Sequence, residues 1–132
     1  MMPRVLIVED DNELRQVVGY ALMDMGVVCE EASDGKQAVE ALCRATGVGE
    51  GFDCVLLDIL MPGGTDGWDV LEAIRKNPLW VDLPVVVLSG KATLPAEVSR
   101  ARELGAVYVQ KTARFVDDVV ERGGEVLGVP EA

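Results

Sequence analysis

The chain has 132 residues, of which 49% are hydrophobic, with 23 acidic and 12 basic residues and a formal net charge of −11. This length fits one domain, and the apolar fraction is sufficient for a buried core. The negative charge disfavours direct binding to nucleic acid or to an anionic membrane, because phosphates would be repelled. No apolar run approaches the roughly 18 residues that span a bilayer, and residues 1–4 lack the layout of a signal peptide. We therefore expect a cytoplasmic protein.

The cysteine and histidine content argues against two kinds of site. Cys29, Cys43 and Cys54 form no C-x-x-C pair, and the chain contains no histidine. A zinc site and a Cys-His nucleophile are therefore disfavoured. The three cysteines are predicted to be reduced residues in or near the core. Because the chain has no histidine, any phosphohistidine that donates a phosphoryl group to it would have to belong to a partner protein.

Short apolar runs alternate five times with amphipathic segments, which is typical of βαβ units and a parallel sheet. Strands are predicted at residues 5–8, 27–32, 53–57, 85–88 and 106–110. Helical patterns cover residues 14–25, 38–45, 67–76 and 95–104, and a last one begins near residue 113. Ser33 or Asp34 can cap the second helix. The pattern predicts a doubly wound α/β fold with helices on both faces of a parallel sheet.

The predicted strands differ in how deeply they should be buried, and the last helix has two possible ends. Continuous Val and Leu runs in strands one, three and four indicate central strands, whereas Glu30 and Glu31 suit an edge. In the last segment, Gly123 and Gly124 interrupt a helical stripe, each at about 1 kcal/mol relative to Ala. The helix could continue through Leu127, or residues 123–132 could form a frayed tail. We expect a single domain over residues 1–132.

Polar side chains follow four of the predicted strands. Glu9 and Asp10 follow the first, Asp58 the third, Ser89 the fourth and Lys111 the fifth. Ligands bind at the carboxyl edge of an open parallel sheet, so these groups are expected to meet there. Glu9, Asp10 and Asp58 offer hard oxygen ligands for Mg²⁺, and Asp58 is a candidate nucleophile toward phosphorus. Lys111 and Ser89 can contact phosphoryl oxygens, although a solvated lysine and a loop-capping serine are the plain alternatives.

The motifs VLIVEDD, LLDILMPGG, VVVLSG and YVQK, taken together, resemble the receiver domain of bacterial response regulators. The resemblance implies a flavodoxin-like sheet of order 2-1-3-4-5, in which a strand separates Cys29 from Cys54. It further implies that a histidine kinase or phosphotransfer protein donates a phosphoryl group to Asp58 in a Mg²⁺-dependent reaction. The backbone carbonyl of Leu60 would complete the metal ligands, and Asp11 would cap the first helix. Tyr108 would act with Ser89 as the switch, unless it is simply an aromatic residue at the sheet rim.

The resemblance also implies how the protein works with others. It would catalyse its own phosphorylation and slow dephosphorylation, without acting as an enzyme on external substrates. Its switched surface, around the fourth helix, fifth strand and fifth helix, would bind an unknown downstream protein. No effector follows within these 132 residues, unless the sequence is part of a larger protein. The expected state is a monomer or weak homodimer.

Two other functions are compatible with the sequence. A hydrolase of the haloacid-dehalogenase type would need a second aspartate two residues after Asp58, where Leu60 stands. A non-phosphorylated interaction scaffold is kept open by Thr112, where the family usually has proline, and by a loop at 61–67 that is one residue longer than usual. A cis or a trans peptide is possible between Lys111 and Thr112. Gly90, in place of a small residue such as Ala, is a mild change.

Overall fold

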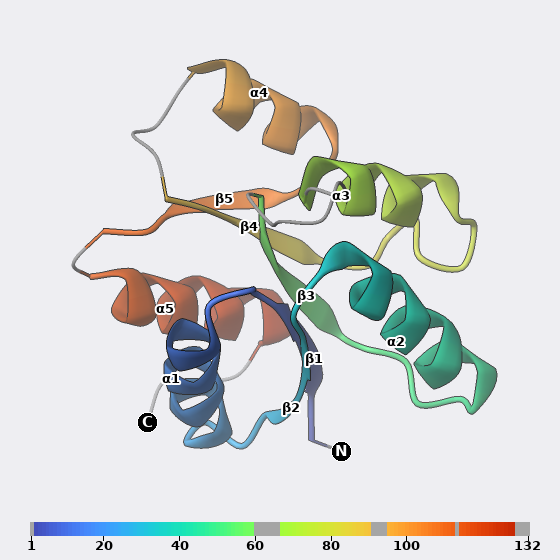
Figure 1. The fold of residues 1–132 in the computed structure, drawn as a ribbon, viewed down its shortest axis with the longest axis horizontal. Coiled ribbons are helices and arrows are strands. Elements are labelled where there is room, and N and C mark those ends of the chain that lie inside the picture. The colour runs from blue at the N-terminus through green and yellow to red at the C-terminus, as the bar shows by residue number, and fades with distance from the viewer. Residues whose placement is uncertain (1, 60–66, 91–94, 113, 129–132) are drawn as a thin grey trace.

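The computed structural model describes residues 2–59, 67–90, 95–112 and 114–128. Within these ranges, five strands alternate with five helices, as expected (Figure 1). The strands are β1 (Arg4–Val8), β2 (Val28–Ala32), β3 (Cys54–Asp58), β4 (Val85–Ser89) and β5 (Val107–Gln110). The helices are α1 (Asn12–Met23), α2 (Gly35–Gly47), α3 (Gly67–Lys76), α4 (Pro95–Glu103) and α5 (Phe115–Leu127).

The strands form one parallel sheet in the order β2-β1-β3-β4-β5, which confirms the predicted topology. β1 therefore lies between β2 and β3. Val5 is paired with Cys29 on one side and with Cys54 on the other. The two cysteines are separated by a strand, as expected, and both are free thiols.

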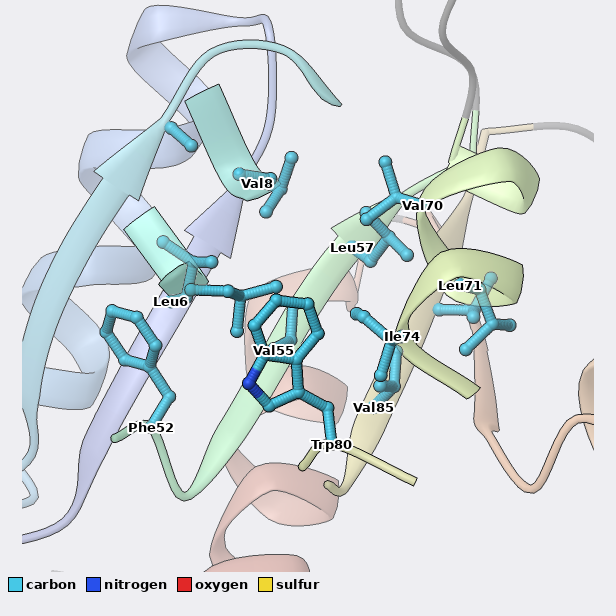
Figure 2. Close-up of a cluster of buried hydrophobic side chains, with 14 of the residues drawn as sticks. Leu6, Val8, Phe52, Val55, Leu57, Val70, Leu71, Ile74, Trp80 and Val85 are labelled. Carbon is cyan, nitrogen blue, oxygen red and sulfur yellow. The ribbon is translucent and has the colours of Figure 1, made fainter. Parts of the chain in front are cut away.

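Successive residues of the central strands face opposite sides of the sheet, as the period of two in a strand requires. In β1, Leu6 and Val8 pack with α2 and α3, whereas Val5 and Ile7 pack with α1 and α5. Figure 2 shows the first of these cores, where Trp80 and Phe52 lie among aliphatic side chains between the sheet and its helices. Burial on both faces explains the continuous apolar runs of the central strands.

Two helices begin with the side-chain caps that aspartate favours. Asp11 accepts a hydrogen bond from the Leu14 backbone N–H at 3.1 Å, so its predicted role as the cap of α1 is confirmed. Asp34, rather than Ser33, caps α2 by accepting from the Gln37 N–H at 2.8 Å. These caps set where the first two helices leave the sheet edge.

The last helix continues through its two glycines and ends at Leu127. Gly123 and Gly124 are buried, and a Cβ added to Gly123 would lie 3.8 Å from Leu22 Cδ2 of α1. Figure 1 shows α1 and α5 side by side on one face of the sheet. Packing against α1 therefore offsets the low helix propensity of glycine. The rest of the expected tail, residues 129–132, lies outside the described residues.

One burial prediction is wrong. Cys43 was expected in or near the core, but it lies on the exposed side of α2. Its neighbours Ala41, Leu42 and Ala45 take the buried positions of this helix instead. Among the helices of the described part of the chain, none has the length and apolar character needed to cross a membrane.

Candidate cation site at the carboxyl edge of the sheet

Three carboxylates converge where β1 and β3 end. One oxygen each from Glu9, Asp10 and Asp58 lies within 4.8 Å of the others. Val8 pairs with Leu57 in the parallel register, so the residues that follow them are brought together. Glu9 and Asp58 are both 3% exposed, whereas Asp10 is open to solvent. The predicted grouping of these acids is therefore present, and its oxygen donors suit a hard cation such as Mg²⁺.

The ammonium group of Lys111 enters the same cluster from β5. Lys111 Nζ lies 3.2 Å from Asp58 Oδ2 and donates to the two carboxylate oxygens of Glu9 at 3.1 and 3.0 Å. Its backbone N–H donates to the carbonyl oxygen of Ser89 at 2.7 Å, which holds the start of the side chain beside β4. The lysine therefore reaches Asp58 as predicted, and it also pairs with Glu9.

Burial and charge shift the pKa values of this cluster. Burial, reinforced by the neighbouring Asp58, raises the pKa of Glu9 to about 7, although Lys111 acts in the opposite direction. Burial by itself would lower the pKa of Lys111, but its hydrogen bond to Glu9 and the nearby negative charges outweigh burial and raise it. Three carboxylates facing one ammonium leave an excess of negative charge. A divalent cation would offset that excess.

Arg15 of α1 contacts the backbone of the acidic cluster at Glu9, and it was not identified from the sequence. Its guanidinium group donates to the backbone carbonyl of Glu9 at 2.7 Å and to Glu31 at 2.9 Å. A basic residue one turn after the Asp11 cap was the available signal, but its partner on β2 is visible only in the folded chain. Arg15 positions the backbone from which Glu9 extends.

Gly67, the first residue of α3, lies directly against the backbone of Asp58. Its N–H donates to the carbonyl oxygen of Ile59 at 2.7 Å. An added Cβ would lie 2.3 Å from the Asp58 carbonyl oxygen and 2.6 Å from Ile59 Cα, which no side chain can occupy. Glycine is therefore required by close approach at this point. The preceding residues, 60–66, lie outside the described residues, as does the predicted carbonyl ligand of Leu60.

Ser89 and Tyr108 are joined by a carboxylate on α4. Ser89 ends β4 and is 2% exposed, and its hydroxyl group lies 3.5 Å from Glu97 Oε2. The Tyr108 hydroxyl group donates to the same oxygen at 3.1 Å. The predicted switch residues therefore lie close together beneath α4. Glu97 was not singled out from the sequence, because an acidic residue in the first turn of a helix is common.

Thr112 follows Lys111 through a trans peptide bond. The Thr112 hydroxyl oxygen accepts from the Arg114 N–H at 3.2 Å, and its carbonyl oxygen accepts from the Phe115 N–H at 3.0 Å. Threonine thus leads the chain into α5, and Lys111 reaches the acidic cluster without the usual proline. An added Cβ at Gly90 would lie 3.9 Å from Lys111 Cδ, an ordinary contact distance, which agrees with the mild change expected there.

The fold and the site together define a class of α/β protein: a doubly wound sheet with three clustered carboxylates and a lysine at its carboxyl edge. The family model for the response regulator receiver domain matches residues 5–117. The chain belongs to this family, as the motifs indicated.

Two curated relatives match most of this chain over a part of their own length. The chain is 33% identical over 108 residues to the DNA-binding transcriptional regulator NtrC of Escherichia coli K12, covering 81% of this chain and 21% of NtrC. It is 29% identical over 96 residues to the transcriptional regulatory protein TcrA of Mycobacterium tuberculosis H37Rv, covering 73% of this chain and 35% of TcrA. The chain therefore spans about a third or less of these relatives.

Solved structures match over almost the whole chain. The chemotaxis response regulator CheY4 of Vibrio cholerae has a TM-score of 0.82 and 26% identity, with 96% of this chain and 100% of that chain covered. A CheY-like receiver domain protein of Methanospirillum hungatei JF-1 has a TM-score of 0.80 and 26% identity, with 97% and 95% covered. The fold described above is thus shared with receivers of similar length.

Proposed function

We propose that this receiver domain accepts a phosphoryl group on Asp58 from the phosphohistidine of a histidine kinase or phosphotransfer protein, in a Mg²⁺-dependent reaction. The observation that carries this proposal is the buried Asp58 carboxylate, which has Glu9 and Asp10 beside it and the Lys111 ammonium group at 3.2 Å. The family supports it, because a receiver works with a kinase partner. The downstream partner is proposed to be another protein.

In the proposed reaction, a carboxylate oxygen of Asp58 attacks phosphorus and forms an acyl phosphate. The bond between phosphorus and the imidazole nitrogen of the donor breaks, and its electron pair remains on the imidazole. Lys111 would pair with the phosphoryl oxygens as charge accumulates on them. The acyl phosphate is later hydrolysed slowly within the same site.

The acidic cluster would hold the cation. Glu9, Asp10 and Asp58 bring together the kind of oxygen donors that Mg²⁺ prefers, and the Leu60 carbonyl is a further proposed ligand. A bound Mg²⁺ would offset the repulsion between the incoming phosphoryl group and the carboxylates. Arg15, through the Glu9 carbonyl, would keep the first of these ligands in place.

Phosphorylation would then change the contacts of Ser89 and Tyr108. A phosphoryl group adds about −1.5 to −2 charge and strong acceptor oxygens. The Ser89 hydroxyl group would donate to one of these oxygens, and Tyr108 would move with it. This is the differential contact between two states that a switch requires, and it would alter the surface around α4, β5 and α5.

Intact-mass analysis tests the proposal after incubation with Mg²⁺ and phosphoramidate as a small phosphoryl donor. Wild type should gain one phosphoryl group, and it should gain none when EDTA is present during the incubation. Asp58→Asn should gain none. Asp53→Asn is the matched control, because Asp53 precedes the same strand at its opposite end and should leave the gain unchanged.

Other outcomes would contradict the proposal. An adduct on Asp58→Asn would place the acceptor elsewhere. No adduct on wild type, with Mg²⁺ binding demonstrated, would favour the scaffold. Multiple turnovers of a phosphomonoester would favour the hydrolase.

A further inference from the structure

A small polar cluster joins the first turn of α4 to the ends of two strands. One oxygen of Glu97 accepts the Tyr108 hydroxyl group at 3.1 Å and lies 3.5 Å from the Ser89 hydroxyl oxygen. Ser89 is buried, whereas Glu97 and Tyr108 are half-buried. A single carboxylate therefore contacts both residues that the proposed switch uses.

The Ser89 hydroxyl group has one proton and can donate to one strong acceptor at a time. Its distance to Glu97 is long for a hydroxyl–carboxylate hydrogen bond, so this contact is weak and readily exchanged. Ser89 follows Leu88, which pairs with Asp58 in the register of β3 and β4. A phosphoryl oxygen on Asp58 and the carboxylate of Glu97 would therefore compete for the same proton.

The remaining contacts of α4 divide it into a firmly held end and a weakly held end. Ala101 is the residue that α4 buries fully, so apolar packing contributes little to holding this helix. At its C-terminal end, the Arg75 guanidinium group donates to the carbonyl oxygens of Leu104 at 2.6 Å and Gly105 at 3.3 Å. At its N-terminal end, among the described residues, Glu97 contacts Ser89 of β4 and Tyr108 of β5 through its carboxylate. Loss of those contacts would free the first turn while Arg75 retains the last.

The fluorescence of Trp68 can report the position of α4. The guanidinium group of Arg100 lies over the Trp68 ring, 4.6 Å from its centre, and pairs with Glu72 at 3.1 Å. Rotation of α4 about its C-terminal end would move Arg100 relative to this ring. The emission of Trp68 should therefore respond to the position of α4.

We propose that Glu97 is a positioning residue that latches α4 in the unphosphorylated conformation by binding the hydroxyl groups of Ser89 and Tyr108. This inference rests on the proposed phosphorylation of Asp58 and assigns its regulation to α4. Glu97 does not take part in phosphoryl transfer. Its contacts with Ser89 and Tyr108 must break when α4 is released, so they oppose the change to the phosphorylated conformation.

Thermodynamic linkage gives the direction of the effect. If Glu97 favours the resting state, then removing its carboxylate must raise the affinity of Asp58 for a phosphoryl mimic. Glu97→Ala should bind beryllofluoride, in the presence of Mg²⁺, about fivefold or more tightly than wild type, the lower end of typical allosteric couplings. Glu97→Gln keeps an acceptor oxygen without the charge, and its affinity should lie between the two.

The experiment measures beryllofluoride affinity by calorimetry and Trp68 emission in a Trp80→Phe background. Glu103→Ala is the matched control, because Glu103 is an exposed glutamate on the same helix. Without beryllofluoride, the emission of Glu97→Ala should already be shifted toward that of saturated wild type, whereas Glu103→Ala should match wild type. In a double-mutant cycle, Glu97→Ala and Tyr108→Phe should be non-additive, because they remove the same hydrogen bond.

The outcomes separate this inference from the function on which it rests. Equal affinities for Glu97→Ala, Glu103→Ala and wild type, with Asp58 phosphorylated normally in all three, would overturn the latch alone. Weaker binding by Glu97→Ala would also overturn it, since Glu97 would then favour the switched state. Failure of wild type to bind beryllofluoride or to be phosphorylated would overturn both. Glu97→Gln keeps the test decisive if the alanine variant is unstable in urea denaturation.

Discussion

The ammonium group of Lys111 donates to both carboxylate oxygens of Glu9, at 3.1 and 3.0 Å, although the two residues are 102 positions apart in the chain. The same ammonium group lies 3.2 Å from Asp58. The lysine therefore serves as the internal counter-ion of two buried carboxylates. A metal ion at this site would share Glu9 with Lys111, which couples cation binding to the position of the lysine.

Replacement of Lys111 by methionine should destabilise the metal-free protein. Two buried carboxylates would lose their cation, and removing one partner of a buried pair costs about 3–5 kcal/mol. The affinity for Mg²⁺ should rise, because a positive charge beside the site is removed. Urea denaturation in EDTA and calorimetric titration with Mg²⁺ measure the two effects. Lys36→Met, on the exposed side of α2, is the control, and equal unfolding free energies for the two variants would contradict the prediction.

Glu9 should make the metal-free protein less stable as the pH rises. Its pKa is about 7 in the folded chain against an ordinary value of 4.5, so the folded state binds more protons between these values. The free energy of unfolding must then fall as pH increases from about 4.5 to about 7, and this contribution should level off above that range.

The Glu9→Gln variant isolates this contribution. Its stability relative to wild type, measured by urea denaturation in EDTA, should increase between pH 5 and pH 8. Glu40→Gln, an exposed glutamate of α2, should show no such trend. Parallel pH profiles for wild type and Glu9→Gln would show that Glu9 titrates normally.

Gly67→Ala should destabilise the fold because of space rather than backbone conformation. The new methyl group would lie 2.3 Å from the Asp58 carbonyl oxygen, so α3 would have to move away from β3. Overpacking typically costs about 1–3 kcal/mol, and phosphorylation of Asp58 should slow as its backbone shifts.

Gly47→Ala is the matched control for this substitution. A Cβ at Gly47, the last residue of α2, would meet nothing within 4 Å, and the change should not lower the free energy of unfolding, because alanine has the higher helix propensity. Chemical denaturation of both variants shows whether each substitution raises or lowers the free energy of unfolding. A neutral Gly67→Ala variant would show that α3 can shift at little cost.

Thiol chemistry should distinguish Cys43 from the other two cysteines. Burial raises the pKa of Cys29 to about 11 and that of Cys54 to about 12, while Cys43 is exposed. Since the thiolate is the reactive form, Cys43 should react rapidly with a disulfide reagent at pH 8. The half-buried Cys29 should react slowly, and the buried Cys54 only on unfolding. Cys43→Ser should remove the rapid phase, and a persisting rapid phase would contradict the described burial.

The fold and much of the site were predictable from local patterns. Alternation along β1 sends Leu6 and Val8 to one face and Val5 and Ile7 to the other, so a run that is apolar throughout already indicates a strand covered on both sides. Glu9 and Asp58 were expected together because parallel strands share a carboxyl edge. These inferences need only the period of a strand and the direction of the chain.

Contacts that depend on the spacing between distant elements were not predictable in this way. Cys43 and Ala41 both belong to the same helical segment, and only the packing of α2 decides which is buried. Arg15 and Glu97 are ordinary charged helix residues until the fold places them against Glu9 and Tyr108.

The sequence by itself therefore determined the order of the elements and the chemistry delivered to the edge of the sheet, because both follow from local hydrophobic periodicity and strand ends. The tertiary structure decided that Lys111 pairs with Glu9 as well as Asp58, and that Glu97 links Ser89 to Tyr108. Hydrogen bonds and ion pairs are strengthened or lost when the separation of two atoms changes by a few tenths of an ångström. Such separations are set by how helices and strands pack, which no local pattern specifies.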